Sequence, residues 1–528
     1  MGKLFKAKAE GWCMERMRPK GRITLTLLIV LLALSLLPVP NCEGSSKPPD
    51  WASIRQGIQG VIDFLDSAAY AQLVSWDEHV VLAYKLAQGR EPTPLEFFLL
   101  RACREDIGMN RSTALSVALR GKARRPTWAQ CRAFLSRVRV SDFRADQGVR
   151  EVARRLSAVP RSEIIRAVKQ MAKPAQLDHP GKQIQVEPPV AGVPYNTYFG
   201  YLHAHSELSD GEGSPNDAYI NAYVYGGLDF FALTDHGELL DGWPFDGEWE
   251  ELVDAAEAFY LPGTYVTLWG FEWSNPFLGH INVLNTPDYT SFVSVFSITD
   301  LYDWLSDRPG GFGRFNHPGD YDDFGSEFLH MELYPGAVPQ MVGIETWNGN
   351  NSFDEYYYAR GWESDFSYWD EGNLQGWYLG ALGGQDNHHP DWGTLNDFRT
   401  AVLAEGLTRE QIVDAYRNRR FYATEDKDLY LDFRCQGYPM GSRLSGVRRT
   451  FIVKARDRSG DKFKQVRLYR NGELLKKKRV TGRRIKVRFR DLSRTGSDYY
   501  YVIVRQRDDS DGNGRKDEAI SSPIWIVD

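Results

Sequence analysis

Residues 230–236 read FFALTDH, an apolar run that ends in an acid and an imidazole, and a second run, YVTLW at 265–269, is followed closely by Glu272. Short apolar runs of this kind are typical of buried strands. Helix-like stretches at 215–226 and 408–418 alternate with them. The pattern predicts an α/β unit over residues 196–427 with polar residues just after its strands, which is the catalytic face of a barrel of parallel strands.

Imidazoles and carboxylates recur at several such points. In the stretch LHAH at 202–205, His203 and His205 stand two residues apart, so on a strand they face the same side and can hold one divalent ion. Asp210 follows at a turn. Each piece alone also fits a capped loop, whereas their gathering in one segment predicts a metal centre. The other candidate ligands are His236, Glu272, His280, His317, Asp386 and His388.

The segment 196–427 is strongly acidic. It holds 9 Lys and Arg against 39 Asp and Glu, while residues 43–195 hold 23 against 16 and residues 428–528 hold 25 against 13. Eight of the 10 histidines fall between His203 and His389. The imbalance fits several bound cations in the middle of the chain, and it also fits charged domains that dock on one another. The basic C-terminal part is able to touch an anionic surface, and nothing in it specifies nucleic acid.

The order of the candidate ligands resembles the PHP family, named for its polymerase and histidinol phosphatase members. The resemblance rests on the HxH pair, on Thr234-Asp235-His236 and on the single ligands that follow them, and it covers about 196–427. The stretches FYAT at 421–424 and SPIW at 522–525 resemble the exported branch called CehA/McbA-like metallohydrolases, which carries a C-terminal β domain. This resemblance implies an α/β fold built on a distorted (β/α)7 barrel.

The resemblance also implies two or three divalent ions, and a mixture of nitrogen and oxygen ligands suits Zn, Mn or Fe. Glu272 would bridge two of the ions, and Asp235 would orient His236 or act as a base behind it. The implied ligand sets are His203, His205, Glu272 and Asp386 for one ion, Glu272, His280 and His317 for a second, and Asp210, His236 and His388 for a third.

Two positions depart from the family pattern. Some members have His where Asp210 stands, which puts the identity or occupancy of the third ion in doubt. Gln385 stands where a small residue usually precedes the last Asp, which bears on access to the site.

Hydrolysis by a hydroxide that the ion cluster activates is the reaction that follows from this ligand set. We expect a phosphoesterase acting on a small-molecule or cell-envelope ester, with Glu272 and Asp235 as catalytic residues. A carbamate or amide hydrolase on the same cluster is the alternative. A non-enzymatic exported binding protein with structural metals is a third interpretation, which the number of ligands disfavours because a structural site usually has four.

The N-terminal flank predicts export. Seven basic residues precede the apolar run Ile23–Leu37, which at 15 residues is short for a bilayer span of about 20. We expect a signal peptide over residues 1–42 and a periplasmic, cell-surface or secreted protein, while a retained signal anchor and lipid attachment at Cys42 stay open. Residues 51–173 have apolar residues at helical spacing and predict a helical domain, and the proline-rich 174–195 predicts a linker.

The C-terminal flank, 428–528, consists of short apolar or alternating runs and predicts a small β-sandwich, with Asn471-Gly472 as a hairpin turn. With these flanks, the 528 residues divide into two to four domains. The stretch DSDGNGRKD at 509–517 has the spacing of a calcium loop, although Ile520 stands where a regular loop has Glu, and a plain solvated turn is equally compatible. The calcium ligands would be Asp509, Asp511, Asn513 and Asp517.

Two further groups of residues leave alternatives open. Cys103 and Cys131 would pair in an exported protein, or stay buried thiols. Five tryptophans near the candidate ligands would line a cleft for a ring or a sugar, or pack in the core. These are Trp269, Trp273, Trp347, Trp369 and Trp377.

Overall fold

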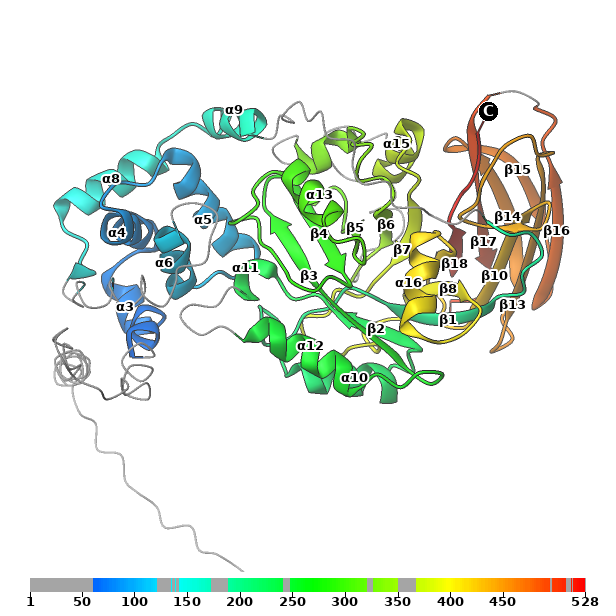
Figure 1. Cartoon of the computed structure of the whole chain (residues 1–528), viewed down its shortest axis with the longest axis horizontal. Coiled ribbons are helices and arrows are strands. Elements are labelled where there is room, and N and C mark those ends of the chain that lie inside the picture. The colour runs from blue at the N-terminus through cyan, green and yellow to red at the C-terminus, as the bar shows by residue number, and fades with distance from the viewer. Residues whose placement is uncertain are drawn as a thin grey trace, which may run out of the picture.

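The structure is a computed structural model that describes residues 60–120, 142–171, 189–240, 247–320, 326–349, 367–493, 496–509 and 516–527, together with residues 134, 138 and 514. Residues 1–42 lie outside these ranges, so the signal peptide, export and lipid attachment at Cys42 stay predictions. None of the described helices is both long and apolar enough to cross a membrane. A helical part, a middle α/β part and a β-rich part follow one another along the long axis of the molecule (Figure 1).

The N-terminal part is helical, as the spacing of its apolar residues predicts. Helices α4 and α5 each begin with a capping box, in which Ser75 or Thr93 accepts from the N–H of Glu78 or Glu96 and that glutamate accepts from the cap N–H. The inward faces of the helices join one buried apolar cluster. The described helices are α3 (Ala68–Leu73), α4 (Trp76–Gln88), α5 (Pro94–Asp106), α6 (Arg111–Arg120), α8 (Gln147–Ser157) and α9 (Arg161–Met171).

The middle part forms a mixed sheet with helices around it, so the α/β class is confirmed, whereas the closed form of the distorted (β/α)7 barrel that the resemblance implies is not. β1, β2 and β3 pair in parallel, as do β5, β6 and β7, but β4 runs antiparallel to both of its neighbours, and β8 runs antiparallel to β1. The strands are β1 (Asn196–Tyr201), β2 (Phe230–Leu233), β3 (Val266–Asn275), β4 (Gly279–Leu284), β5 (Phe312–Phe315), β6 (Met341–Trp347), β7 (Gly380–Gly383), β8 (Arg399–Ala404) and β9 (Phe421–Thr424).

The sheet curls without closing. Among the described strands, no ladder joins β7 to β8 or β9. Thr400 of β8 fills the gap, because its hydroxyl accepts from Gly383 N at 3.0 Å and donates to Gly383 O at 2.8 Å. A Cβ on Gly383 would lie 2.9 Å from Arg399 O, so the close approach needs glycine there. A side chain therefore bridges the place where a barrel would have a backbone ladder.

Helices surround this sheet, and several of them begin with a side-chain cap. Ser214 accepts from Asp217 N at the start of α10, where Pro215 occupies the first turn. The interior of the curled sheet is filled by apolar side chains such as Phe230, Leu268 and Leu382. The helices are α10 (Pro215–Val224), α11 (Gly237–Leu240), α12 (Glu248–Ala258), α13 (Ile298–Ser306), the 3-10 helix η3 (Glu327–Met331), α15 (Tyr368–Gln375) and α16 (Arg409–Arg417).

The C-terminal part has the two facing sheets expected of a sandwich, and they enclose a separate apolar cluster. β10, β11, β13 and β16 form one sheet, whereas the other continues the middle sheet because β18 pairs with β9, with Ile520 opposite Ala423. No break in the sheet therefore separates the two parts. The strands are β10 (Leu429–Cys435), β11 (Tyr438–Pro439), β12 (Arg443–Leu444), β13 (Thr450–Asp457), β14 (Phe463–Arg470), β15 (Glu473–Arg479), β16 (Arg484–Arg490), β17 (Asp498–Gln506), β18 (Glu518–Ser521) and β19 (Ile524–Ile526).

The predicted hairpin turn is confirmed. Asn471 and Gly472 connect β14 to β15, and their φ angles are 52° and 82°. A two-residue hairpin loop of this type needs a positive φ at both positions, and Asn and Gly adopt such angles at little cost.

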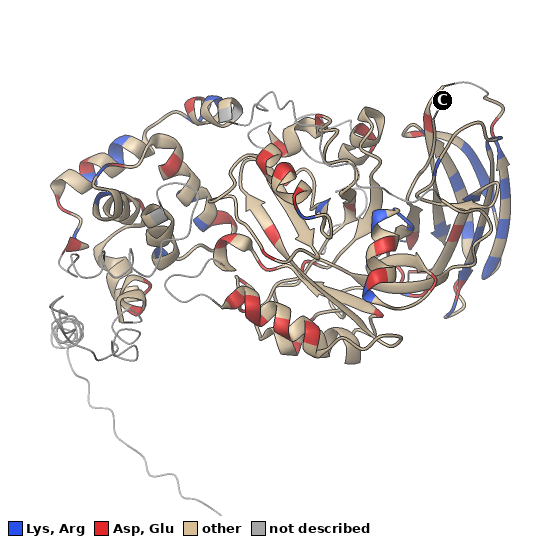
Figure 2. Ribbon diagram, viewed as in Figure 1, with Lys and Arg blue, Asp and Glu red and all other residues tan. Residues whose placement is uncertain are grey.

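Acidic and basic residues separate in space as they do in sequence. Figure 2 shows Asp and Glu over the middle part and Lys and Arg along the outer strands of the C-terminal part. Most side chains of β15 and β16 are exposed, and most of those are basic. Contact of this surface with an anionic partner stays a prediction.

Candidate metal centre

Glu272 lies in the middle of the candidate centre. It stands inside β3, whereas the sequence pattern predicted an acid after the end of that strand. Its Oε1 atom lies 3.3 Å from both His203 Nε2 and His280 Nδ1. Its Oε2 atom lies 3.4 Å from His205 Nε2 and 3.1 Å from His236 Nδ1. A carboxylate whose two oxygens face different imidazoles is arranged to bridge metal ions.

His203, His205 and Asp386 form the first group of ligands. The two histidines directly follow β1, and Ala204 between them makes a bridge with Asn387, which follows β7. This pairing brings Asp386 Oδ1 to 3.1 Å from His203 Nε2 and 3.0 Å from His205 Nε2. Together with Glu272, these atoms surround one point, as the HxH spacing predicts.

His280 and His317 form the second group. His280 lies near the start of β4, and His317 follows β5. His317 Nε2 lies 3.5 Å from Glu272 Oε1, the same oxygen that faces His280. Asn316 Nδ2 donates to that oxygen at 2.6 Å, which orients the carboxylate.

Asp210, His236 and His388 form the third group. Asp210 Oδ1 lies 3.5 Å from His236 Nε2, and its Oδ2 lies 3.4 Å from His388 Nε2. His205 lies between the two imidazoles, with ring centroids 4.4 Å from His236 and 4.3 Å from His388. These four residues can each offer one ligand atom within 4.8 Å of the others. All nine predicted ligands are thus brought together, while metal binding itself stays a prediction.

The centre is buried except along one side. The side chains of Asp386, Asp210 and His388 are 19, 21 and 36% exposed, while those of the other six ligands are at most 8% exposed. Two surface cavities of about 590 and 1020 Å³ are lined by none of the nine ligands. A substrate would therefore reach the centre from the side of these three residues.

Three buried atoms test whether the residues fit a metal ion. His203 Nε2, His205 Nε2 and Asp386 Oδ1 are buried and have no hydrogen bond of acceptable geometry among the described residues. Leaving such atoms unsatisfied is unfavourable, and a divalent cation would satisfy all three at once. The residues therefore fit the ion that the ligand pattern implies.

Charges within the centre balance each other without metal. Burial would raise the pKa of Glu272, but the imidazoles of His203 and His280 hold it well below its ordinary value. Burial likewise disfavours the protonated form of His388, but Asp210 and Asp386 raise its pKa to about 10. Protonated imidazoles thus supply the positive charge that bound ions would otherwise bring.

Asp235 does not orient His236, which was one of its two predicted roles. Its Oδ1 atom accepts from Ser206 N at 2.7 Å and from Ser209 Oγ at 2.6 Å, and its Oδ2 atom accepts from Ser206 Oγ at 3.0 Å. Among the described residues it makes no hydrogen bond to His236, whose Nδ1 lies 2.5 Å from Ser274 Oγ instead. Asp235 therefore holds the loop after the HxH pair, while its role as a base stays a prediction.

Gln385 does not narrow the site. It is fully buried, its Oε1 atom accepts from Tyr201 OH at 3.1 Å, and its Nε2 atom donates to Asn396 O at 2.6 Å. Four of the five tryptophans near the ligands are also at most 1% exposed, which corrects the cleft interpretation in favour of core packing. These four are Trp273, Trp347, Trp369 and Trp377.

Sequence reasoning missed the residues that support the ligands. Glu345 in β6 is buried and contacts His203 Nδ1 at 2.9 Å and Arg314. Asp106 at the end of α5 lies 3.2 Å from His280 Nε2. An acid inside the apolar run VGIETW at 342–347 was the available signal for Glu345, and nothing in the sequence links residue 106 to residue 280.

Two further predictions concern residues that the structure describes only in part. Asp511 and Asn513 of the calcium loop lie outside the described residues, while Asp517 gathers with Asp426 and Asp461 in a group that could hold a cation. Cys103 is a free, buried thiol, which agrees with the second of the two alternatives, and Cys131 lies outside the described residues.

No family model matches the chain. The chain is 25% identical over 376 residues to an uncharacterized protein of Chlamydia pneumoniae, a match that covers 63% of this chain and 57% of that protein. It is 29% identical over 144 residues to an uncharacterized protein of Chlamydia trachomatis, which covers 24% of this chain and 22% of that protein. The chain therefore spans little more than half the length of the first relative and about a fifth of the second.

Among solved structures, the chain is similar to a two-domain protein of Bacteroides vulgatus that contains a predicted PHP-like metal-dependent phosphoesterase. The identity is 20%, and the match covers 62% of this chain and 94% of that chain with a TM-score of 0.35. A TM-score this low does not establish a shared fold, so we interpret the centre from its own geometry.

Proposed function

We propose that this chain is an exported, metal-dependent phosphoesterase of the PHP type that acts on a small-molecule or cell-envelope ester. The position of Glu272 carries the proposal. Its side chain is 1% exposed, and its two oxygens face imidazoles from three groups of candidate ligands. The nine candidate ligands, Glu272 among them, exceed the four that a structural site needs.

Divalent ions held by these ligands would lower the pKa of a water molecule and polarise a phosphoryl oxygen. The chain's own residues supply the rest. Glu272 and Asn316 fix the centre of the ligand set, and the burial of His203, His280 and His317 excludes bulk water. Asp386 and His388 border the open side, where a substrate would enter.

The number of ligand groups favours a phosphoester over a carbamate. Three groups surround Glu272, and phosphoryl transfer spreads negative charge over three equatorial oxygens. A planar carbamate offers a single carbonyl oxygen. Cations are also needed to admit an anionic substrate, since the surrounding segment holds 39 acidic residues against 9 basic ones.

The test is Glu272→Gln in the full chain, assayed on phosphomonoesters, phosphodiesters and aryl carbamates after loading with Zn²⁺ or Mn²⁺. A neutral amide is a poor bridge, so we expect a loss of several kcal/mol in barrier, roughly a thousandfold or more in rate. Glu251→Gln on the exposed face of α12 is the matched control and should retain full activity.

Elemental analysis of both variants and of wild type separates binding from chemistry. Wild type should hold at least two ions per chain. One ion or none in wild type would refute the proposal of a metal cluster. Equal activity of Glu272→Gln and wild type on every substrate would show that Glu272 has no part in the mechanism. Cleavage of carbamates alone would move the activity to the amide-hydrolase alternative.

A further inference from the structure

Helix α5 of the N-terminal part ends in two acids at the terminus where the helix dipole disfavours negative charge. Glu105 and Asp106 are its last residues. The Glu105 side chain is 69% exposed and pairs with Arg101 one turn earlier. Asp106 has a side chain only 16% exposed and turns toward the middle part. An acid that points inward at this terminus does not stabilise the helix. The reason for the position of Asp106 must therefore lie in the contacts that its side chain makes.

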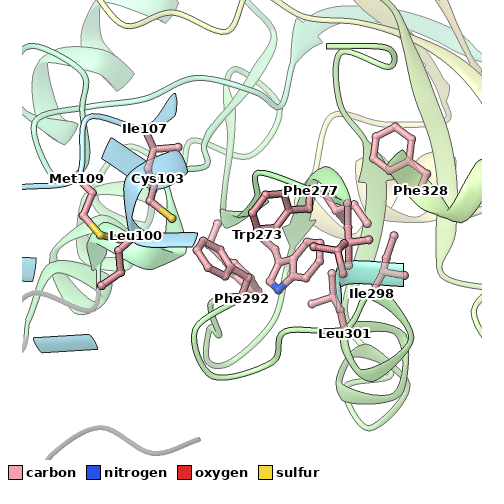
Figure 3. Packing of buried hydrophobic residues seen from close by; sticks show 14 of the residues in the cluster. Leu100, Cys103, Ile107, Met109, Trp273, Phe277, Phe292, Ile298, Leu301 and Phe328 are labelled. Atoms are coloured by element: carbon pink, nitrogen blue, oxygen red, sulfur yellow. The ribbon is translucent and has the colours of Figure 1, made fainter. Parts of the chain in front are cut away.

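Apolar packing fixes where Asp106 lies. Side chains of α5 and of the turn after it share one buried cluster with residues that surround β3, so the helical part is docked on the middle part. Figure 3 shows Leu100, Cys103, Ile107 and Met109 beside Phe292, Trp273 and Phe277. Each of these side chains is at most 1% exposed.

Asp106 contacts a candidate ligand directly. Its Oδ2 atom lies 3.2 Å from His280 Nε2, while His280 Nδ1 lies 3.3 Å from Glu272 Oε1 on the other side of the ring. An ionised carboxylate only accepts hydrogen bonds, so Nε2 donates to Asp106. The neutral imidazole then presents its lone pair at Nδ1, toward Glu272.

The turn after α5 also reaches the third group of ligands. Gly108 has a φ of 63°, and a Cβ built on it would lie 4.0 Å from Asp210 Cβ. The segment from Asp106 to Gly108 thus approaches the second group at His280 and the third group at Asp210.

We propose that Asp106 is a positioning residue of the metal centre and that the helical part belongs to the site. Asp106 would hold His280 in the tautomer whose Nδ1 binds the second ion, as Glu345 holds His203 from within the sheet. Occupancy of the Glu272–His280–His317 group would then depend on a residue outside the α/β part. This inference rests on the proposed function.

The test compares Asp106→Ala, Asp106→Asn and the control Glu105→Gln in the full chain. Metal-free protein is titrated with Zn²⁺ against a competing chelator, bound ions are counted by elemental analysis, and Co²⁺-loaded samples are compared by visible absorption. We expect Asp106→Ala to weaken one ion by roughly 10- to 100-fold and to change one component of the Co²⁺ spectrum. Asp106→Asn, which keeps an acceptor oxygen and the side-chain volume, should lose less, and Glu105→Gln should match wild type.

Melting temperatures of the metal-free variants separate positioning from folding. Unchanged affinity for every ion in Asp106→Ala would overturn the inference. Loss of all ions together with a lowered melting temperature in Asp106→Ala, alongside wild-type behaviour of Asp106→Asn, would also overturn it by showing a structural role. Failure of wild type itself to bind more than one ion would instead refute the proposed function.

Discussion

His203 Nδ1 lies 2.9 Å from Glu345 Oε1, and this contact leaves Nε2 of the same ring facing Glu272. Glu345 is fully buried in β6. Its Oε2 atom accepts from His317 N at 2.8 Å and from Asn348 Nδ2 at 2.7 Å. One buried acid therefore fixes the orientation of ligands from two strand ends, which is how carboxylates commonly support metal-binding histidines.

Glu345→Gln should weaken both the metal centre and the fold. The affinity for one ion should fall roughly 10- to 100-fold, because His203 loses its carboxylate partner. The buried guanidinium of Arg314 also loses its ion-pair partner, which destabilises the fold by about 3–5 kcal/mol. Chelator competition and thermal melting measure the two effects. The double variant Glu345→Gln/Arg314→Met should regain stability and keep the weakened affinity, and recovery of both properties together would contradict the separation of these roles.

Most of the ligands could be predicted from the sequence because they lie within or just after an apolar run, whereas Asp210 stands at a turn. His203-x-His205 after β1, His236 after β2 and Asp386 after β7 all occupy positions where strands deliver side chains to one edge. The strand pattern itself was less informative. Nothing in the residues of β4 shows that it runs antiparallel to β3, and the distorted (β/α)7 barrel was implied by the family resemblance and not by the strand pattern.

Supporting residues escaped prediction for a different reason. Glu345 is distinguished from other buried acids by its contacts with His203 and Arg314. His203 lies 142 positions away from it along the chain. Asp106 belongs to the helical part of the chain. The spacing of apolar residues there indicates which residues pack in the core, but not which residues contact the metal centre. Asp235 shows the opposite error, a predicted contact that the structure does not contain. Its position next to His236 in the sequence favoured a contact with that ring, but Ser274 makes this contact instead.

Metal uptake should release protons and should strengthen as pH rises. Carboxylates raise the pKa of His236 and His280 against the effect of burial, and the pKa of His388 to about 10. The His388 ring is therefore protonated in metal-free protein at pH 7, the raised pKa values of the other two rings favour their protonated forms, and all three must be neutral to bind ions. Zn²⁺ added to weakly buffered metal-free protein should release more than one proton per chain, and affinity should rise between pH 6.5 and about 10. Uptake of ions with no proton release would contradict this charge balance.

The mature protein should begin near residue 43. The seven basic residues and the short apolar run that follows them motivate this expectation. Expression in an exporting host, followed by N-terminal mass spectrometry of the exported fraction, measures it directly. An intact leader in that fraction would refute cleavage, and a lipid-modified Cys42 would identify an anchored form.

Glu425 provides a second pH-dependent feature, at the junction of the middle and C-terminal parts. Its side chain is buried, and its Oε2 atom accepts from Glu518 N of β18 at 2.9 Å. Burial raises its pKa from 4.5 to about 8, and the nearby carboxylates of Glu518 and Asp517 also favour the protonated form. The folded state therefore keeps a proton on Glu425 over a range of pH in which the unfolded chain releases it.

Glu425→Gln should remove part of the loss of stability at high pH. The folded pKa is raised, so the free energy of unfolding falls as pH rises from about 4.5 to about 8 and levels off above that. Each tenfold difference in proton affinity between the folded and unfolded states corresponds to about 1.4 kcal/mol of this free energy. A glutamine stays neutral and keeps an oxygen to accept from Glu518 N. In chelator-treated protein, Glu425→Gln should therefore melt close to wild type at pH 4.5 and well above it at pH 9. The control is Glu473→Gln on exposed β15, which should follow wild type at both values. Equal melting of Glu425→Gln and wild type at pH 9 would show that Glu425 ionises at little cost where it lies.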